Sequence, residues 1–329
     1  MEQESIFEPQ RPENIMYSFR GFANDEESIK SQKEFAEYMN FLITEISKHI
    51  DVRSLDGITI TDESEYDNAL KELDRGIETN QLTSSKGEVI GVAIAPAVIR
   101  NNEIKSHIIY NYNYISNITN FESENYYHSM YTFTHELAHV EITNGLDKCF
   151  PNTILREKLY DSKKINQSLI NMVCLEEYCA CRISGGLDKN NIIREMYEET
   201  LINHLSKFEL HIENAIQQYK KDNMGDKLYS LMYTEYGNLL KYASYYLGHI
   251  ENQEFNWESS LRLASILNNN KWFRDYFLEL KEVLNQLWSK YNKWTNKIEF
   301  DAISNIAEKM INEKVEFLIL FNRIFVKIK

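Results

Sequence analysis

A five-residue pattern near the middle of the chain constrains the fold more than any other feature. His135 and His139, with Glu136 directly after the first, spell H-E-x-x-H within the mostly apolar stretch from Tyr131 to Ile142. Residues four apart on a helix share one face, so both imidazoles can bind a single metal ion, for which zinc is the expected choice. Glu136 points about 100° around the helix and is expected to act as the general base. The pattern therefore predicts a buried helix that carries a metal site.

A third ligand is needed, because catalytic zinc usually has three protein ligands and one open position. The segment Cys174–Ser184 reads CLEEYCACRIS and predicts a second helix with two adjacent carboxylates, Glu176 and Glu177. Either of them is a candidate for the third ligand on these grounds.

The combination of HELAH with a later helix carrying E-x-x-A resembles the gluzincin metallopeptidases. In that group the third zinc ligand is a glutamate on the helix after the H-E-x-x-H helix. The string EYCACR, which starts at Glu177, is similar to the E-Y-E-A-D-R string of the membrane-associated M48-type peptidases. This resemblance selects Glu177 over Glu176. The sequence departs from the pattern of those families at Cys181, where they carry an aspartate that supports the site.

Composition bounds the possible partners and the compartment. With 36 basic and 50 acidic residues among 329, the net charge of −14 disfavours nucleic acid and anionic lipid. The amino terminus lacks the basic start and apolar run of a secretory signal, and no stretch reaches the roughly eighteen apolar residues that span a bilayer. A cytoplasmic protein with four reduced cysteines is expected. Its oligomeric state cannot be read from the sequence.

The first half of the chain predicts a small mixed region. Residues 1–25 are expected to form an extended arm. Of the two strands predicted at 88–95 and 106–111, one is expected to hold an extended peptide at its edge. An ordinary structural role for that strand is the alternative. The predicted elements are a helix at 25–50, a strand at 55–61, a helix from 62 or 64 to 74, and strands at 88–95 and 106–111.

The second half contains no proline after Pro151 and predicts helices almost throughout. The fold class is therefore α+β, mainly α, with a zincin-like catalytic region at 26–186 and an α-helical region at 187–329 that closes the cleft. Residues 315–329 are expected to end a helix that docks on the core, with a membrane or partner contact as the alternative. The predicted helices span 165–184, 190–221, 226–249, 257–268, 272–291 and 297–329.

Peptide hydrolysis needs a hydrogen-bond donor that stabilises the oxyanion formed when zinc-bound water attacks the scissile carbonyl. We expect this donor in the predicted helical half. Tyr246 and His249 lie three apart on one predicted helix face and are candidates for this role. A tyrosine-rich helix that simply packs in the core is the alternative reading.

The function predicted from these residues is that of a zinc metallopeptidase. It would hydrolyse peptide bonds in a peptide or protein substrate, as a selective cytoplasmic enzyme with a regulatory or defence role. Two alternatives stay open: a catalytically silent, zinc-stabilised binding or regulatory protein, and a zinc hydrolase of small amides.

Overall fold

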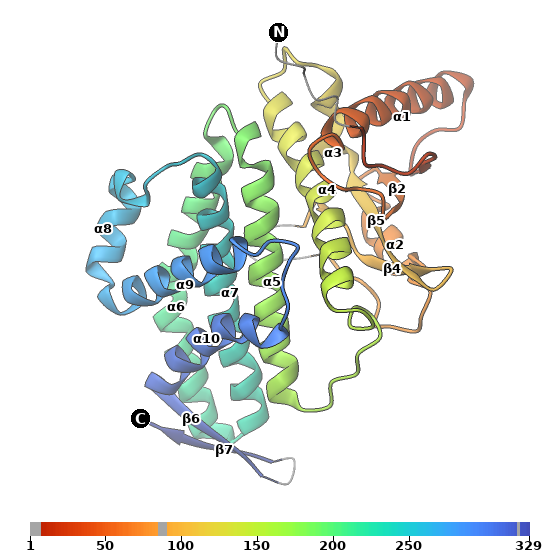
Figure 1. The fold of residues 1–329 in the computed structure, drawn as a ribbon. Helices are drawn as coiled ribbons and strands as arrows, with labels where there is room; N and C mark the ends of the chain where they lie inside the picture. Colours follow the sequence, from red (N-terminus) through yellow and green to blue (C-terminus); the bar gives the residue numbers. More distant parts are fainter. Residues whose placement is uncertain (1–7, 85–90, 321–322) are drawn as a thin grey trace. The chain divides into compact units, whose positions relative to one another are not determined.

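The computed structural model describes residues 8–84, 91–320 and 323–329, and it is mainly helical with a small sheet. This confirms the α+β, mainly α class. By their contacts the residues divide into two compact units. The first comprises Met1–Glu157 and Gly186–Ile192, and it holds the sheet; the second comprises Lys158–Gly185 and Ile193–Lys329 (Figure 1).

This division differs from the ranges expected from the sequence. Residues 158–185, which were expected to belong with the catalytic region, have most of their contacts within the helical unit. The functional roles given to 26–186 and 187–329 stay predictions.

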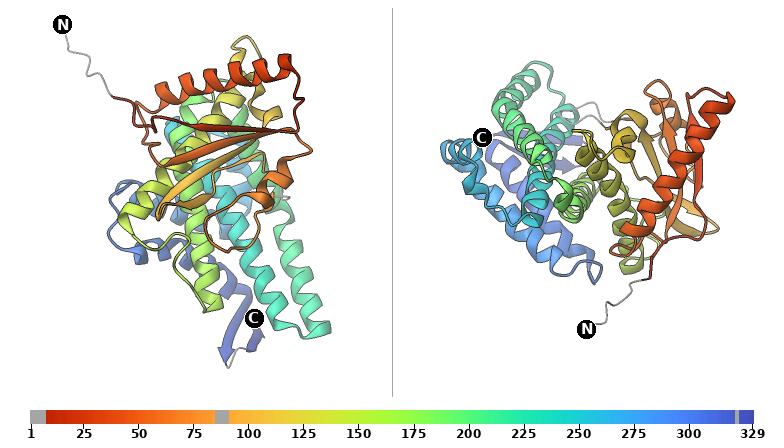
Figure 2. Two further views of the ribbon diagram at one scale, coloured as in Figure 1. Left: turned by 90° about the vertical axis from the view of Figure 1, so that its right-hand side faces the viewer. Right: turned by 90° about the horizontal axis from the view of Figure 1, so that it is seen from above.

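The sheet of the first unit has five strands among the described residues (Figure 2). β2 (Leu55–Thr61) lies between β1 (Met16–Arg20) and β5 (Glu103–Asn111), and both neighbours run parallel to it. β3 (Ala93–Ile94) and β4 (Ala97–Arg100) pair antiparallel with β5. The order places β5 inside the sheet.

Strand β1 corrects the prediction of an extended arm at residues 1–25. Residues 16–20 pair in register with 57–61 of β2. A five-residue edge strand has little periodicity of its own, and its partner lies much later in the chain, so the pairing depends on tertiary structure. Residues 1–7 of the predicted arm lie outside the described residues.

The strands predicted at 88–95 and 106–111 are confirmed to different extents. The strand expected at 88–95 falls partly on residues 85–90, which lie outside the described residues, and its described end contains β3. The strand expected at 106–111 is confirmed and begins earlier, at Glu103. Because β5 has β2 on one side and β3 and β4 on the other, it cannot offer a free edge to a peptide. Of the two strands considered for that role, only β3 ends the strand order.

Helix α1 (Glu26–Ile46) begins where the sequence predicts it. The Asp25 carboxylate accepts a hydrogen bond of 2.9 Å from the main-chain N–H of Ser28 and so satisfies one free donor of the first turn. The left view of Figure 2 shows this helix running alongside the strands. The shorter helices of this unit are α2 (Tyr66–Glu72), α3 (Tyr112–Ile115) and η1 (Ser116–Thr119).

The second unit is built from long helices, as predicted. Helix α5 (Ser162–Ser184) packs most extensively against α7 (Gly225–Asn252), and α10 (Asp301–Lys314) packs against both of them. The remaining helices of this unit are α6 (Ile192–Asp222), η3 (Trp257–Ser259), α8 (Leu261–Asn269), α9 (Lys271–Trp288) and η4 (Lys297–Phe300). The short helix η2 (Gly185–Leu187) belongs mostly to the first unit.

The carboxyl end was predicted wrongly as helix. The helix α10 ends at Lys314, and β6 (Val315–Leu320) and β7 (Arg323–Ile328) form an antiparallel two-stranded sheet. The segment is rich in β-branched and aromatic residues, and in β7 half-buried and exposed side chains alternate strictly. This period of two is the strand signal that the helical interpretation overlooked.

Across the described part of the chain, none of the helices combines the length and apolar character needed to cross a membrane.

Candidate metal centre

The H-E-x-x-H pattern lies on helix α4 (Tyr126–Cys149), which confirms the predicted helix. Two hydrogen bonds tie this helix to the first unit's core. The Tyr110 hydroxyl of β5 donates to the main-chain oxygen of Phe133 at 2.9 Å, and the Ser54 hydroxyl donates to that of Val140 at 3.4 Å. One anchor precedes the pattern and the other follows it, so the core of the first unit holds the helix on both sides of the two histidines.

The two imidazoles of α4 converge on one point. Nε2 of His135 and Nε2 of His139 lie 3.1 Å apart, and their ring planes meet at 78°. Two nitrogens at ~2.0–2.1 Å from one zinc ion, in tetrahedral geometry, would lie ~3.3 Å apart. The observed separation is thus close to that of two ligands of a single ion. The ring of Tyr131, one turn earlier, stacks on His135 at a centroid distance of 5.8 Å.

Glu136 is buried, with 7 % of its surface exposed. Its charge acts on two buried phenols of the same unit, Tyr66 and Tyr110. Burial raises the pKa of both phenols well above the ordinary value, and the negative charge of Glu136 raises each pKa further. Both phenols therefore stay protonated and neutral near this carboxylate at any physiological pH.

Helix α5 positions the predicted third ligand. The Asp161 carboxylate caps its start by accepting a hydrogen bond of 2.9 Å from the Lys164 N–H. The helix buries Cys174, Leu175 and Tyr178 completely, which leaves Glu176 and Glu177 on its partly exposed side.

His135, His139 and Glu177 form a group that could hold a metal ion. Each residue offers one ligand atom, and these atoms all lie within 4.8 Å of one another. Glu176, the neighbouring carboxylate that spacing alone left open, does not belong to this group. The donors are two nitrogens and one oxygen, a set that suits zinc among other divalent ions.

One lysine that was not singled out from the sequence lies on α7, the helix that packs against α5. Lys241 of α7 is half-buried, and burial lowers the pKa of its amine, while the negative charge of Glu177 opposes that shift. Its Nζ also lies 4.9 Å from the centroid of the Tyr242 ring. One lysine within the apolar run LLKYASYY was the only sequence signal, and a single charge on a helix gives no information about what it faces.

Tyr246 and His249, the predicted oxyanion donors, are both completely buried in the helical unit. The phenol of Tyr246 lies near Glu198 of α6; burial first, and that carboxylate second, raise its pKa above the ordinary value. The ring of His249 meets that of Tyr197, also on α6, at a centroid distance of 5.8 Å. These contacts link α7 to α6, and a role in catalysis stays a prediction for both residues.

The cysteines are all free thiols, and three of them on α5 are completely buried. Burial raises the pKa of Cys174 to about 12, so this thiol stays protonated at neutral pH.

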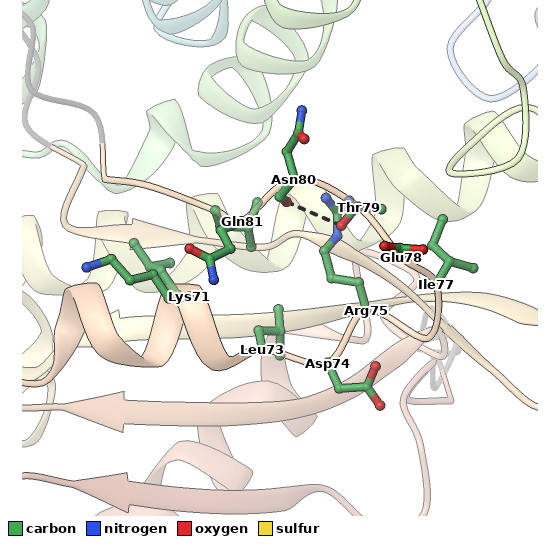
Figure 3. A pocket seen from close by; sticks show the side chains of 11 residues that line it. Lys71, Leu73, Asp74, Arg75, Ile77, Glu78, Thr79, Asn80 and Gln81 are labelled. Atoms are coloured by element: carbon green, nitrogen blue, oxygen red, sulfur yellow. Dashed lines mark hydrogen bonds between the residues drawn. The ribbon is translucent and has the colours of Figure 1, made fainter.

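Surface hollows lie elsewhere in each unit. One in the first unit is enclosed by residues 70–82, which fold back on themselves after α2 (Figure 3). There the Arg75 guanidinium donates a hydrogen bond of 3.0 Å to the main-chain oxygen of Ala97 on β4. One in the second unit is lined by Arg182, Glu251 and Asn285, among others. Neither hollow includes a predicted ligand or catalytic residue.

No protein-family model, curated protein or solved structure matches the chain. The side chains of α4, α5 and α7 are therefore the basis for any functional assignment.

Proposed function

We propose that the protein is a zinc-dependent metallopeptidase of the gluzincin type with a zincin-like catalytic region. The observation that carries the proposal is the convergence of His135, His139 and Glu177, whose ligand atoms lie within 4.8 Å of one another. Two neutral imidazoles and one carboxylate are a donor set that leaves a fourth position open for water.

In this proposal each residue has a distinct task. His135 and His139 would hold the ion with their imidazoles, and Glu177 would contribute a carboxylate with its negative charge. The bound zinc ion would acidify its water and polarise the peptide carbonyl. Glu136 would accept the proton of the attacking water and pass it to the leaving amine.

Burial supports the role of Glu136. Only 7 % of its surface is exposed, so bulk water is largely kept away from the carboxylate that would accept the proton.

The test is the variant Glu136→Gln, studied with zinc-loaded full-length protein. Elemental analysis reports the bound metal, and mass spectrometry of a peptide library reports cleavage. We expect the variant to keep its zinc and to lose cleavage by a factor of at least about 100, the lower end of the contribution of a general base. The variant Glu124→Gln, an exposed carboxylate just before α4, serves as the control and should behave as the wild type.

Other outcomes would contradict the proposal. A wild-type protein that binds zinc but cleaves no peptide would favour the zinc-stabilised binding protein, and cleavage of small amides alone would favour the amide hydrolase. Absence of a bound divalent ion at saturating zinc would overturn the metal site itself.

A further inference from the structure

Three helices of the second unit, α5, α7 and α9, meet in a group of hydrogen-bonded polar side chains. Nη1 of Arg182 on α5 lies 2.5 Å from a carboxylate oxygen of Glu251 on α7 and 2.8 Å from the side-chain oxygen of Asn285 on α9. The Tyr178 hydroxyl accepts a hydrogen bond from Arg182 and donates one to Glu251. The Asn285 amide donates to the other Glu251 oxygen at 2.6 Å. We call these four residues the Arg182 cluster.

The guanidinium of Arg182 is held in place but not fully used. Its Cζ atom lies 4.7 Å from the centroid of the Trp288 ring, which supports the planar group from one face. Nη1 makes all of its hydrogen bonds within the described part of the chain, so the N–H groups of Nε and Nη2 donate to none of those residues. The side chain is 21 % exposed. Adjacent N–H groups on a guanidinium match the two oxygens of a carboxylate.

A hollow opens at the Arg182 cluster. Its volume of about 330 Å³ lies at the lower end of the range of small-molecule sites. All of its lining residues belong to the second unit. The polar part of the lining includes Arg182, Glu251, Lys281 and Asn285, and the apolar part is Ile250, Phe255 and Trp257.

The charges around the hollow leave one cation without full compensation. Nζ of Lys281 on α9 lies 3.8 Å from Glu251, so the Glu251 carboxylate is shared between Lys281 and Arg182. Glu251 is only 10 % exposed, and the pairs are therefore partly desolvated. The second carboxylate of the lining, Glu254, is exposed and forms no ion pair with a described residue, so solvent screens its charge. A partly desolvated excess of positive charge favours an added anion.

We propose that this hollow binds a small carboxylate ligand. Arg182 holds the carboxylate with the N–H groups of Nε and Nη2, and the Lys281 ammonium supplies the second positive charge. The apolar side chains of the lining contact the remainder of the ligand. This binding site needs no metal ion and goes beyond the proposed peptidase activity.

The test compares benzoate with benzamide, two probes of nearly equal shape that differ in charge. Ligand-observed NMR titration of the full-length protein gives both affinities. We expect the wild type to bind benzoate at least about tenfold more tightly, as is typical of hydrogen bonds to a charged group. The variant Arg182→Lys keeps the positive charge but lacks the planar pair of donors, and it should lose most of this preference.

Lys281→Met removes the second cation and should weaken benzoate binding a few-fold, while the affinity for benzamide stays the same. Lys271→Met changes an exposed lysine on the same helix and should alter neither affinity. Thermal unfolding of each variant checks that the fold is intact. Because Lys281 is 37 % exposed, its variant keeps the inference testable if Arg182→Lys is unstable.

Equal affinity of the wild type for both probes, or no binding of benzoate, would overturn the inference. A preference for benzoate that persists unchanged in the folded Arg182→Lys and Lys281→Met variants would overturn it as well, since the anion then binds elsewhere. None of these outcomes depends on zinc binding or peptide cleavage, so this inference and the proposed function can fail separately.

Discussion

The hydroxyl of Tyr110 donates a hydrogen bond of 2.9 Å to the main-chain oxygen of Phe133, two residues before His135. Tyr110 is completely buried on β5, and its ring lies 5.8 Å from the Phe133 ring. The sheet thereby contacts helix α4 directly before His135, the first of the proposed metal ligands.

We expect Tyr110→Phe to lower the free energy of unfolding by about 1 kcal/mol, the usual net value of one such hydrogen bond. It should also weaken zinc binding, because the turn that carries His135 becomes less well ordered. Denaturant unfolding and competition with a zinc chelator measure the two effects. Tyr17→Phe is the matched control, since the Tyr17 hydroxyl bonds Asn40 of α1 at 3.2 Å instead. Equal loss of zinc affinity in both variants would contradict the special position of Tyr110.

Glu177 and Glu176 provide an internal comparison for the metal site, since they are adjacent and both partly buried. We expect Glu177→Ala to lower zinc affinity by at least about 100-fold, because loss of a mere outer-shell partner already costs about 10–100-fold. Glu176→Ala should stay within a few-fold of the wild type. Chelator competition at constant pH gives both affinities. A larger loss of zinc affinity in Glu176→Ala would show that Glu177 is not the third ligand.

Asp51 joins the segment before β2 to helix α4. Its carboxylate binds the Arg53 guanidinium at 2.6 Å and the Lys148 amine at 3.3 Å. These contacts, led by the hydrogen bond from Arg53, lower the pKa of Asp51 to about 2. The folded pKa lies below the unfolded value of about 3.9, so the group stabilises the fold above about pH 4, and this contribution is lost as the pH falls toward 2.

Asp51→Asn should therefore be less stable than the wild type at pH 7 by about 1 kcal/mol, a value reduced for screening by solvent. The difference should shrink between pH 4 and pH 2, because the wild-type carboxylate is itself protonated there. Urea unfolding at a series of pH values measures it. Glu63→Gln, which removes an exposed carboxylate, should leave the pH dependence unchanged. If the stability difference between the wild type and Asp51→Asn grew on acidification, the stabilising role of the ionised Asp51 carboxylate would be contradicted.

Gly248 and Gly237 test the packing of α7 on α5. A methyl group at Gly248 would meet the backbone of Tyr178, which cannot move aside, so Gly248→Ala should destabilise the protein by about 2 kcal/mol. At Gly237 the methyl group would lie 3.1 Å from Cγ1 of the Ile170 side chain, which can shift more easily than a backbone, and the better helix propensity of alanine compensates, so the change should stay within about 1 kcal/mol. Thermal and urea unfolding of both variants measure the difference. A loss as small at Gly248 as at Gly237 would contradict the close approach, because helix α7 could then shift away from the Tyr178 backbone.

The local elements of the site could be predicted because their signals are local. The spacing of His135 and His139 requires only the 3.6-residue turn of one helix, and the capped start at Asp25 depends on residues three apart. Strand β1 and the carboxyl-terminal pair β6 and β7 could not be predicted in this way. Strand pairing joins segments that the sequence does not mark as partners, and a short apolar run fits a helix or a strand equally well.

The sequence by itself determined the chemistry available to this protein: two imidazoles one helical turn apart, a glutamate between them, and a second helix with two candidate carboxylates. The resemblance of the EYCACR string favoured Glu177, but only the tertiary structure could group it, and not Glu176, with the two histidines as residues that could hold a metal ion. The reason is physical. Periodicity within one helix specifies which side chains share a face, whereas the register between two packed helices depends on close contacts such as Gly248 against Tyr178.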